Sequence, residues 1–414
     1  MTRRPHWACV DARRVHNMAT DNPLDASRIR VVVFIQENKT TDFYFPSLSA
    51  WGADVRSGGP LLAAPPDHDQ PHDRSVWVHY RMGDYPALAA QLNNDAVIPY
   101  YSWLAKTFTF CDHHFGIGTN STPGHMMTIG GQTPTLKNPP FGTAGPQWDI
   151  PSIFARAQRG GLSWAAFAGA GDYPVKFYKE LNTPAAKKNI HTAGAFIALA
   201  KAGKLPRLTY AWAPSGADEH PPQTPDPQYI ARGQQTVWER VDAVVQGGQW
   251  ANTVFILTWD DWGGYADHVV TPDAERVPDA LHPNGFQAIG GSRIPLIMFG
   301  GAVMQGIDNT WHSHASSPKT IIDLFGLPAF GVPRVDQAPS LAGRVHAALN
   351  RPAPPGLGAT IVQPTAPLPR PQPVPPPPWP GLLGQPMPAL VANGGKTIPA
   401  PTDGVVHPKP PPPP

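Results

Sequence analysis

The chain between residues 28 and 350 alternates short apolar runs with polar turns. The runs are rich in β-branched and aromatic residues, which is typical of strands buried on both faces of a sheet. Five runs follow this pattern, at residues 28–35, 162–169, 207–214, 252–259 and 293–300.

Helical stretches are predicted between and after these runs. Residues 149–161 end at a glycine pair, 228–246 carry apolar positions near helical spacing, and 317–326 start with a serine cap and a proline in the first turn. Strands alternating with helices predict an α/β fold, a three-layer α/β/α sandwich with a mainly parallel sheet. Three stretches have little pattern and predict irregular loops, at residues 55–75, 170–205 and 270–290.

The end of the chain has a different composition, because 23 of the 64 residues from Arg351 to Pro414 are proline. Such a segment buries few apolar side chains and donates few backbone hydrogen bonds, which favours disorder or polyproline II. We therefore expect a weakly ordered extension at residues 1–27, one folded domain at 28–350 and a disordered tail at 351–414. The tail could act as a spacer or could bind a partner that recognises proline motifs.

Charge and cysteine content exclude several classes of protein. A formal net charge of +2 gives no electrostatic reason to expect nucleic acid as a partner. Two cysteines exclude a disulfide scaffold. No apolar stretch approaches the roughly 20 residues that span a bilayer, and the basic N-terminal stretch lacks the apolar segment of a signal peptide. These features predict a cytoplasmic protein, with a secreted or periplasmic one as the alternative if the start is misassigned.

Polar residues with metal-binding chemistry follow three of the predicted strands. Glu37 and Asn38 follow the first, Asp260 and Asp261 follow the run at 252–259, and Glu219 with His220 follows the run at 207–214. In open α/β sheets, ligands bind beyond the carboxyl ends of the strands. Two adjacent aspartates repel each other, so a cation is expected beside them, and oxygen donors suit a hard divalent metal ion. The alternative is that these residues only form polar turns.

Ser121 in the segment "TNSTPGH" is a candidate nucleophile. Pro123 favours a helix start here, and a helix N-terminus attracts anions such as phosphate. A serine oxygen next to a metal ion loses its proton more readily and can attack phosphorus. The alternative is that Ser121 is an ordinary helix cap.

Several long segments, in this order, resemble the bacterial phosphoesterase family, which includes phospholipases C and acid phosphatases. The resemblance covers about residues 28–341 and rests on "QENKTTDFYF", "LAKTFTFCDHHFGIGTNSTPGHMMTIGG", "DEHPP", "TWDDWGGYADHV", "SRIPLIMFG" and "HSHASSPKTIIDLFGLP". It implies an alkaline phosphatase-like sandwich that hydrolyses phosphate esters through a covalent phosphoenzyme. The substrate would be a small phosphate ester or a lipid headgroup, and the cofactor one or more divalent metal ions.

The resemblance also implies roles for individual residues. Ser121 would be the nucleophile, and the metal ligands would be Glu37, Asn38, Ser121, Asp260 and Asp261. His220 or His314 would protonate the leaving group. The substrate would be bound by His72, Glu219, His125 and His268.

Two departures from the phospholipase-type pattern bear on the substrate. Serine stands where those members have threonine, and His125 stands where they have arginine. The serine and the Asp260–Asp261 pair are similar to the acid phosphatase branch, so we expect a phosphomonoesterase. The alternatives are a phospholipase C-like phosphodiesterase and a non-catalytic, metal-binding interaction protein.

Overall fold

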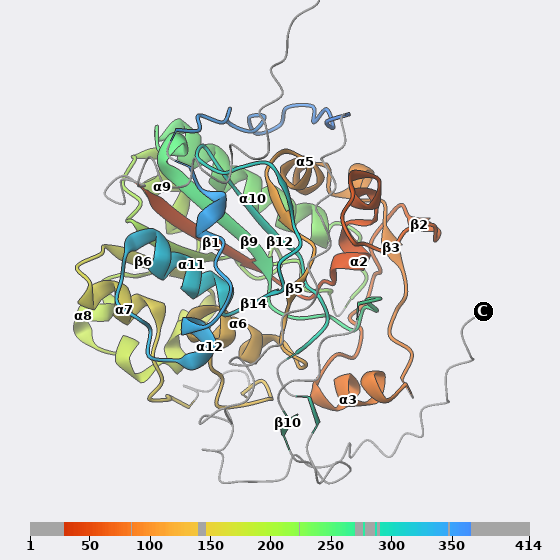
Figure 1. The fold of residues 1–414 in the computed structure, drawn as a ribbon, viewed down its shortest axis with the longest axis horizontal. Helices are drawn as coiled ribbons and strands as arrows, with labels where there is room; N and C mark the ends of the chain where they lie inside the picture. Colours follow the sequence, from red (N-terminus) through yellow and green to blue (C-terminus); the bar gives the residue numbers. More distant parts are fainter. Residues whose placement is uncertain are drawn as a thin grey trace, which may run out of the picture.

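An eight-stranded sheet runs through the centre of the molecule (Figure 1). The computed structural model describes residues 29–83, 85–139, 146–222, 224–269, 290–346 and 348–365, and also the backbone of two short strands, β10 (Arg276–Val277) and β11 (Phe286–Gln287). The order of the sheet is β13 (Gly306–Asp308), β4 (Thr109–Cys111), β12 (Leu296–Gly300), β9 (Thr253–Trp259), β1 (Arg30–Gln36), β8 (Leu208–Trp212), β6 (Trp164–Ala168) and β7 (Ile190–Thr192).

The sheet is mainly parallel, as the sequence predicts. β1 lies between β8 and β9 and is parallel to both, and β6 and β7 continue the same direction. β12, which corresponds to the apolar run at 293–300, is antiparallel to β9 and β4. The apolar pattern does not reveal this reversal, because a strand buried on both faces looks the same in either direction.

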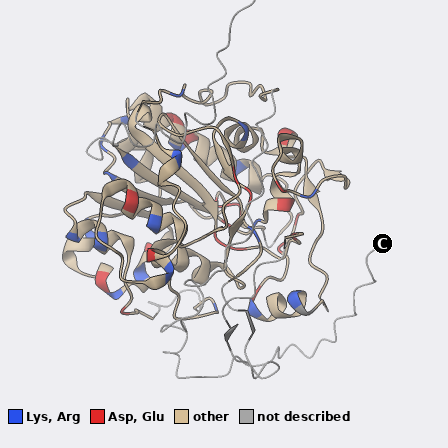
Figure 2. Cartoon of the chain, viewed as in Figure 1, with Lys and Arg blue, Asp and Glu red and all other residues tan. Residues whose placement is uncertain are grey.

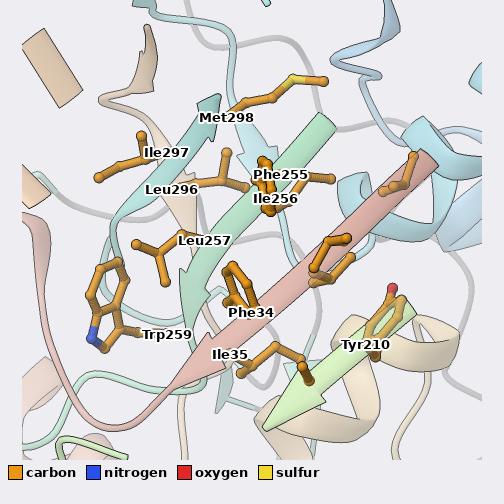
Figure 3. Close-up of a cluster of buried hydrophobic side chains, with 14 of the residues drawn as sticks. Phe34, Ile35, Tyr210, Phe255, Ile256, Leu257, Trp259, Leu296, Ile297 and Met298 are labelled. Carbon is orange, nitrogen blue, oxygen red and sulfur yellow. The ribbon is translucent and has the colours of Figure 1, made fainter. Parts of the chain in front are cut away.

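The apolar runs form the core because both faces of the sheet are covered. Every residue of β9, β8 and β12 is buried, and Figure 3 shows side chains such as Phe34, Leu257 and Leu296 filling the space around the strands. Each buried aliphatic or aromatic side chain of this kind stabilises the fold by about 1.5–3 kcal/mol.

Helices cover both faces, which confirms the three-layer α/β/α prediction. On one face, Phe34 of β1 packs against Phe196 of α9 (Ala195–Lys201), and the Arg240 guanidinium of α10 (Tyr229–Gln246) lies over both rings. On the opposite face, the Tyr210 ring packs on Phe154 of α7 (Ile153–Arg159). Tyr210 pairs with Val33, the neighbour of Phe34, and adjacent strand positions point to opposite faces.

The other helices and short strands join these layers. The helices predicted at 228–246 and 317–326 are present as α10 and α11 (Ser316–Phe325). The region 170–205 is less irregular than expected, because it contains the edge strand β7 and helices α8 and α9. The remaining α-helices and strands are α2 (Thr41–Tyr44), α3 (Arg74–Met82), α4 (Asn94–Val97), α5 (Pro99–Thr107), α6 (Ser121–Gly130), α8 (Pro184–Lys187), α12 (Pro333–Asp336), β2 (Leu61–Leu62), β3 (Gln91–Leu92), β5 (His114–Phe115) and β14 (His312–Ser313).

Residues 351–365, the start of the predicted tail, lie on the domain and contact α10 and α5. The Trp238 indole donates to the carbonyl of Pro355 at 2.8 Å, and the Gln363 amide donates to the carbonyl of Pro99 at 2.8 Å. The rest of the tail, residues 1–28 and most of 270–289 lie outside the described residues. Among the residues described, no helix is both long and apolar enough to cross a membrane.

Candidate active site

The segments that follow β1 and β9 meet at the carboxyl ends of these strands, where Figure 2 shows acidic segments close together. The pairing of the two strands extends to Gln36 and Trp259, so the next residues of each strand are neighbours. The Asp260 carboxylate accepts hydrogen bonds from the backbone N–H groups of Asn38 at 2.8 Å and Asp261 at 2.7 Å. The predicted convergence of these residues is therefore present in the fold.

The carboxylates of Glu37, Asp260 and Asp261 are crowded in this place. Burial, together with the charge of Glu37, raises the pKa of Asp260 to about 6. Burial, Asp260 and Glu37 raise the pKa of Asp261 well above its usual range. In the described part of the chain, Asp260 Oδ2 and Asn38 Oδ1 are buried and have no hydrogen-bond partner. Such atoms are costly to bury unless a further group binds them.

A divalent cation fits this set of donors. Carboxylate, amide and hydroxyl oxygens are the ligands that hard divalent ions prefer, and the two unpartnered oxygens are available to such an ion. The donor types do not distinguish between several metals. Glu37, Asn38, Asp260, Asp261 and Ser121 therefore make up a candidate metal centre.

Ser121 is the first residue of α6 and is 6% exposed. Its hydroxyl donates to Asp261 Oδ2 at 3.4 Å. The N-cap position belongs to Asn120, so Ser121 is not the helix cap that the sequence left as an alternative. α6 approaches the acidic segment closely because residue 124 is glycine, and a β-carbon there would lie 2.2 Å from the Asp260 carbonyl oxygen.

His125 lies one turn along α6 from Ser121 and is fully buried. Its Nε2 lies 2.8 Å from Glu37 Oε1 and 3.6 Å from Asp260 Oδ2, and its Nδ1 lies 3.3 Å from the Trp212 indole nitrogen. Burial lowers the pKa of His125, but Glu37 and Asp260 outweigh this effect and raise it. The expected substrate-binding role is not supported, because both ring nitrogens contact protein groups.

His72 and His220 lie near each other beside the acidic cluster, with their ring centroids 6.3 Å apart. His72 Nε2 is 3.3 Å from the Asn38 amide nitrogen and 3.8 Å from Asp261 Oδ2, and His72 Nδ1 donates to the Gln70 carbonyl at 2.6 Å. His220 donates from Nδ1 to the Pro221 carbonyl at 2.8 Å, and its side chain is 36% exposed. Both histidines therefore lie near the candidate metal centre, with His220 the more open to solvent.

Asp69 lies beside His72 and His220, and the sequence did not identify it as a candidate site residue. Its Oδ2 lies 4.0 Å from His220 Nε2, and its Oδ1 lies 3.6 Å from His72 Nδ1. The spacing "DQPH" is a weak signal that could have suggested it. Asp69, His72 and His220 are close enough together to hold an ion. Both ring nitrogens of His72 are already in hydrogen bonds, however.

His314 is placed differently from expectation. It is 1% exposed, and its Nε2 donates to the carbonyl of Trp259 at 3.2 Å. Burial lowers its pKa to about 4, so the ring is neutral near pH 7. The expected role of His314 as a proton donor is therefore not supported.

Glu219 lies in the core, with its carboxylate hydrogen-bonded to protein groups. It is 0% exposed, and its two carboxylate oxygens accept four hydrogen bonds, from Tyr44, Tyr101, Trp259 and Gln36. No oxygen is left for a substrate, so the expected binding role is not supported. Sequence reasoning grouped Glu219 with His220 because they are adjacent.

His268 contacts a second acidic group. Its Nδ1 lies 2.7 Å from Asp42 Oδ2, and its Nε2 lies 3.1 Å from Asp54 Oδ1. Arg293 donates to Asp42 at 2.9 Å and to Asp267 at 2.8 Å, and so supplies the positive charge that this group requires. The expected contact of His268 with substrate is not supported, because both ring nitrogens are engaged here.

Lys39 is a further residue that the sequence analysis missed. Its ammonium is buried, and it donates to the carbonyls of Glu37 at 3.0 Å and Glu219 at 2.8 Å. Burial lowers its pKa to about 8, while Glu219 and Asp260 oppose that effect. Lys39 thereby ties the segment after β1 to the segment after β8. The signal in the sequence that could have identified Lys39 is its position directly after Glu37 and Asn38.

The fold and the site define an α/β protein with an acidic, serine-containing centre at the carboxyl ends of parallel strands. Residues 62–328 match the model of the Phosphoesterase family. The chain belongs to the phosphoesterase family, which confirms the resemblance seen in the sequence.

Curated relatives are similar at low identity. Non-specific phospholipase C4 of Arabidopsis thaliana is 26% identical over 62% of this chain and 50% of that protein. Phospholipase C A of Mycobacterium tuberculosis is 24% identical over 66% of this chain and 59% of that protein. The chain spans about half the length of the curated relatives it matches.

Two solved structures are also similar. The lipoteichoic acid synthase LtaP from Listeria monocytogenes gives a TM-score of 0.43 at 11% identity, covering 77% of this chain and 78% of that one. A protein of the alkaline phosphatase superfamily from Vibrio parahaemolyticus gives 0.40 at 14% identity, covering 72% and 67%.

Proposed function

We propose that this protein hydrolyses phosphate esters by transferring the phosphoryl group to Ser121, with a divalent cation held by Glu37, Asn38, Asp260, Asp261 and Ser121. The observation that carries the proposal is the 3.4 Å contact between the Ser121 hydroxyl and Asp261 at the start of α6. Membership of the phosphoesterase family and the phospholipase C names of the relatives support it.

Ser121 and Asp261 carry the first half of the reaction. The Ser121 proton moves to Asp261 Oδ2 as Oγ attacks phosphorus, so that an Oγ–P bond forms and the bond from phosphorus to the leaving oxygen breaks. A bound divalent cation would lower the pKa of the hydroxyl and offset negative charge on the phosphoryl oxygens. The backbone N–H groups at the start of α6 favour the same anion.

The second half regenerates the serine. Water attacks the phosphoserine and gives a proton to the histidine that protonated the leaving oxygen, so that a new P–O bond forms. The Oγ–P bond breaks, and Asp261 returns its proton to Oγ. Of the two histidines proposed to assist the leaving oxygen, His220 is the better supported, because it is more exposed than His314 and lies near the acidic cluster. The Glu37 and Asp69 charges raise the pKa of His220 against the opposing effect of burial.

The substrate class we propose is a phosphomonoester, as for acid phosphatases. The serine nucleophile and the Asp260–Asp261 pair favour it. A second candidate is a phosphodiester, and the names of the relatives favour that alternative.

Paired chromogenic substrates test the proposal directly. Purified full-length chain is assayed with p-nitrophenyl phosphate and p-nitrophenylphosphorylcholine, with and without added divalent metal, from acidic to neutral pH. Faster turnover of the monoester supports the acid phosphatase type, and faster turnover of the diester supports the phospholipase C type. No turnover of either by metal-loaded protein would favour the non-catalytic alternative.

The nucleophile is tested by Ser121→Ala. A loss of about 1,000-fold or more in kcat is expected, since the attacking oxygen is removed. Ser317→Ala is a matched control, because Ser317 is also buried in the first turn of a helix. Near wild-type turnover in Ser121→Ala would rule out the assignment.

A further inference from the structure

We propose that His125 is a positioning residue for the metal centre: together with Trp212 it holds one oxygen of Glu37 and leaves the other for the cation. This inference rests on the proposed function only in taking Glu37 as a metal ligand. It goes beyond that function because it gives a role to two side chains that bind neither metal nor substrate.

The first step is the protonation of the His125 ring. An indole N–H can only donate a hydrogen bond, so the Trp212 N–H, at 3.3 Å, requires a lone pair on His125 Nδ1. A neutral imidazole carries its proton on the other nitrogen. His125 Nε2 therefore bears the proton and donates it to Glu37 Oε1 at 2.8 Å.

The two hydrogen bonds of the His125 ring argue against His125 as a metal ligand. Glu37, His125 and Asp260 are close enough together to hold an ion, so distance alone would allow an imidazole ligand. A ring nitrogen that bears a proton has no lone pair for a metal, however, and the only lone pair faces Trp212. The geometry therefore assigns His125 to Glu37 and not to the cation.

The second step is rigidity, because three separate elements hold these groups in place. Glu37 follows β1, Trp212 ends the neighbouring strand β8, where it pairs with Ile35, and His125 lies on α6. His125 is fully buried, and the Tyr173 ring packs edge-on against it with the centroids 5.3 Å apart. The side chain that orients Glu37 is thus set before any cation arrives.

Removing such an orienting group typically weakens metal binding about 10- to 100-fold. We therefore expect Trp212→Phe and His125→Ala to weaken binding of Mn²⁺ by about 10-fold or more. His125→Gln, whose amide can still donate to Glu37 and accept from Trp212, should recover part of the loss. Trp250→Phe is the matched control, because the Trp250 indole is also buried and donates to the carbonyl of Arg351 at 2.9 Å.

Isothermal titration of chelator-treated, full-length protein with Mn²⁺ measures these affinities without any assay of turnover. An unchanged dissociation constant for Mn²⁺ in Trp212→Phe would overturn the proposal. If His125 were a direct metal ligand, or had no role in metal binding, the affinity would not depend on the Trp212 N–H. A loss in Trp212→Phe with wild-type affinity in Trp250→Phe supports it.

Imidazole ¹⁵N NMR of the wild-type chain gives a second readout that needs no variant to fold. The expected spectrum shows His125 protonated at Nε2 and bare at Nδ1 with Mg²⁺ or Zn²⁺ bound. A proton on Nδ1, or direct coordination through Nε2, would overturn the proposal. Neither readout measures turnover, so failure of Ser121 as the nucleophile would show in Ser121→Ala turnover and would leave both readouts of the wild-type site unchanged.

Discussion

The α-carbon of Gly124 faces the backbone carbonyl of Asp260 so closely that a β-carbon would lie 2.2 Å from the carbonyl oxygen. Gly124 lies one turn into α6, and Ser121 is at its start. The approach of α6 to the segment after β9 therefore depends on a residue without a side chain. It brings the Ser121 hydroxyl to Asp261 and His125 to Glu37.

Gly124→Ala should damage both stability and activity. Inserting a methyl group into a packed contact costs about 1–3 kcal/mol of unfolding free energy, and here the strain moves α6 away from Asp260. We expect a lower midpoint in urea unfolding and a reduced kcat/KM for a phosphate ester. Gly194→Ala is the control, because nothing lies near a β-carbon there. Wild-type activity in Gly124→Ala would contradict this view of the contact.

Metal removal should lower the stability of the protein. A ligand that binds only the folded state at 100 times its dissociation constant stabilises by about 2.7 kcal/mol, and here the ligand also offsets carboxylate repulsion. We expect chelation to lower the melting temperature and a divalent metal to restore it. A melting temperature that changes neither on chelation nor on addition of metal would argue against a metal centre.

Asp260→Asn should separate stability from metal binding. Burial and Glu37 oppose ionisation of Asp260, as its raised pKa indicates. A neutral amide removes that repulsion, so the metal-free variant should unfold at a higher temperature than metal-free wild type. Added metal should stabilise the variant less than wild type. Scanning calorimetry of both proteins, with and without metal, measures the two effects.

Glu219→Gln should act on stability and little on chemistry. The carboxylate oxygens accept from Tyr44, Tyr101, Trp259 and Gln36, and an amide NH₂ would face two of these donors with a donor of its own. Leaving buried groups unpaired costs about 1–3 kcal/mol, which urea unfolding would detect. Glu239→Gln, on the exposed side of α10, is the control. A change in KM without loss of stability would instead support substrate contact.

His268 provides a pH-dependent test away from the candidate metal centre. The hydrogen bond to Asp42 raises the pKa of His268, with burial opposing it. A raised histidine pKa stabilises the folded state below the unfolded value of about 6.5, and the benefit is lost as pH rises through the folded pKa. Wild type should therefore exceed His268→Gln in stability at pH 5.5, by less than about 1 kcal/mol for this partly exposed pair.

The difference should shrink above neutral pH, which thermal unfolding across the range would show. His68→Gln is the control, since His68 and its partner Asp67 are both largely exposed. A stability difference that is constant with pH would contradict the ion-pair explanation.

The sequence by itself determined the layers of the fold and the acidic part of the site. Apolar runs without polar interruptions predict strands buried on both faces, and such strands require helices on either side. Their carboxyl ends then lie at one edge, so residues just after β1 and β9 meet there. Glu37, Asn38, Asp260 and Asp261 could be grouped for this reason.

Only the tertiary structure decided the roles of the remaining side chains. Glu219 and His220 are neighbours in sequence, yet one points into the core and the other lies 4.0 Å from Asp69. His314 is buried against the Trp259 carbonyl, and His125 lies between Trp212 and Glu37. The physical reason is that a polar side chain acts through its hydrogen-bond partners, and here those partners come from segments far apart in the chain.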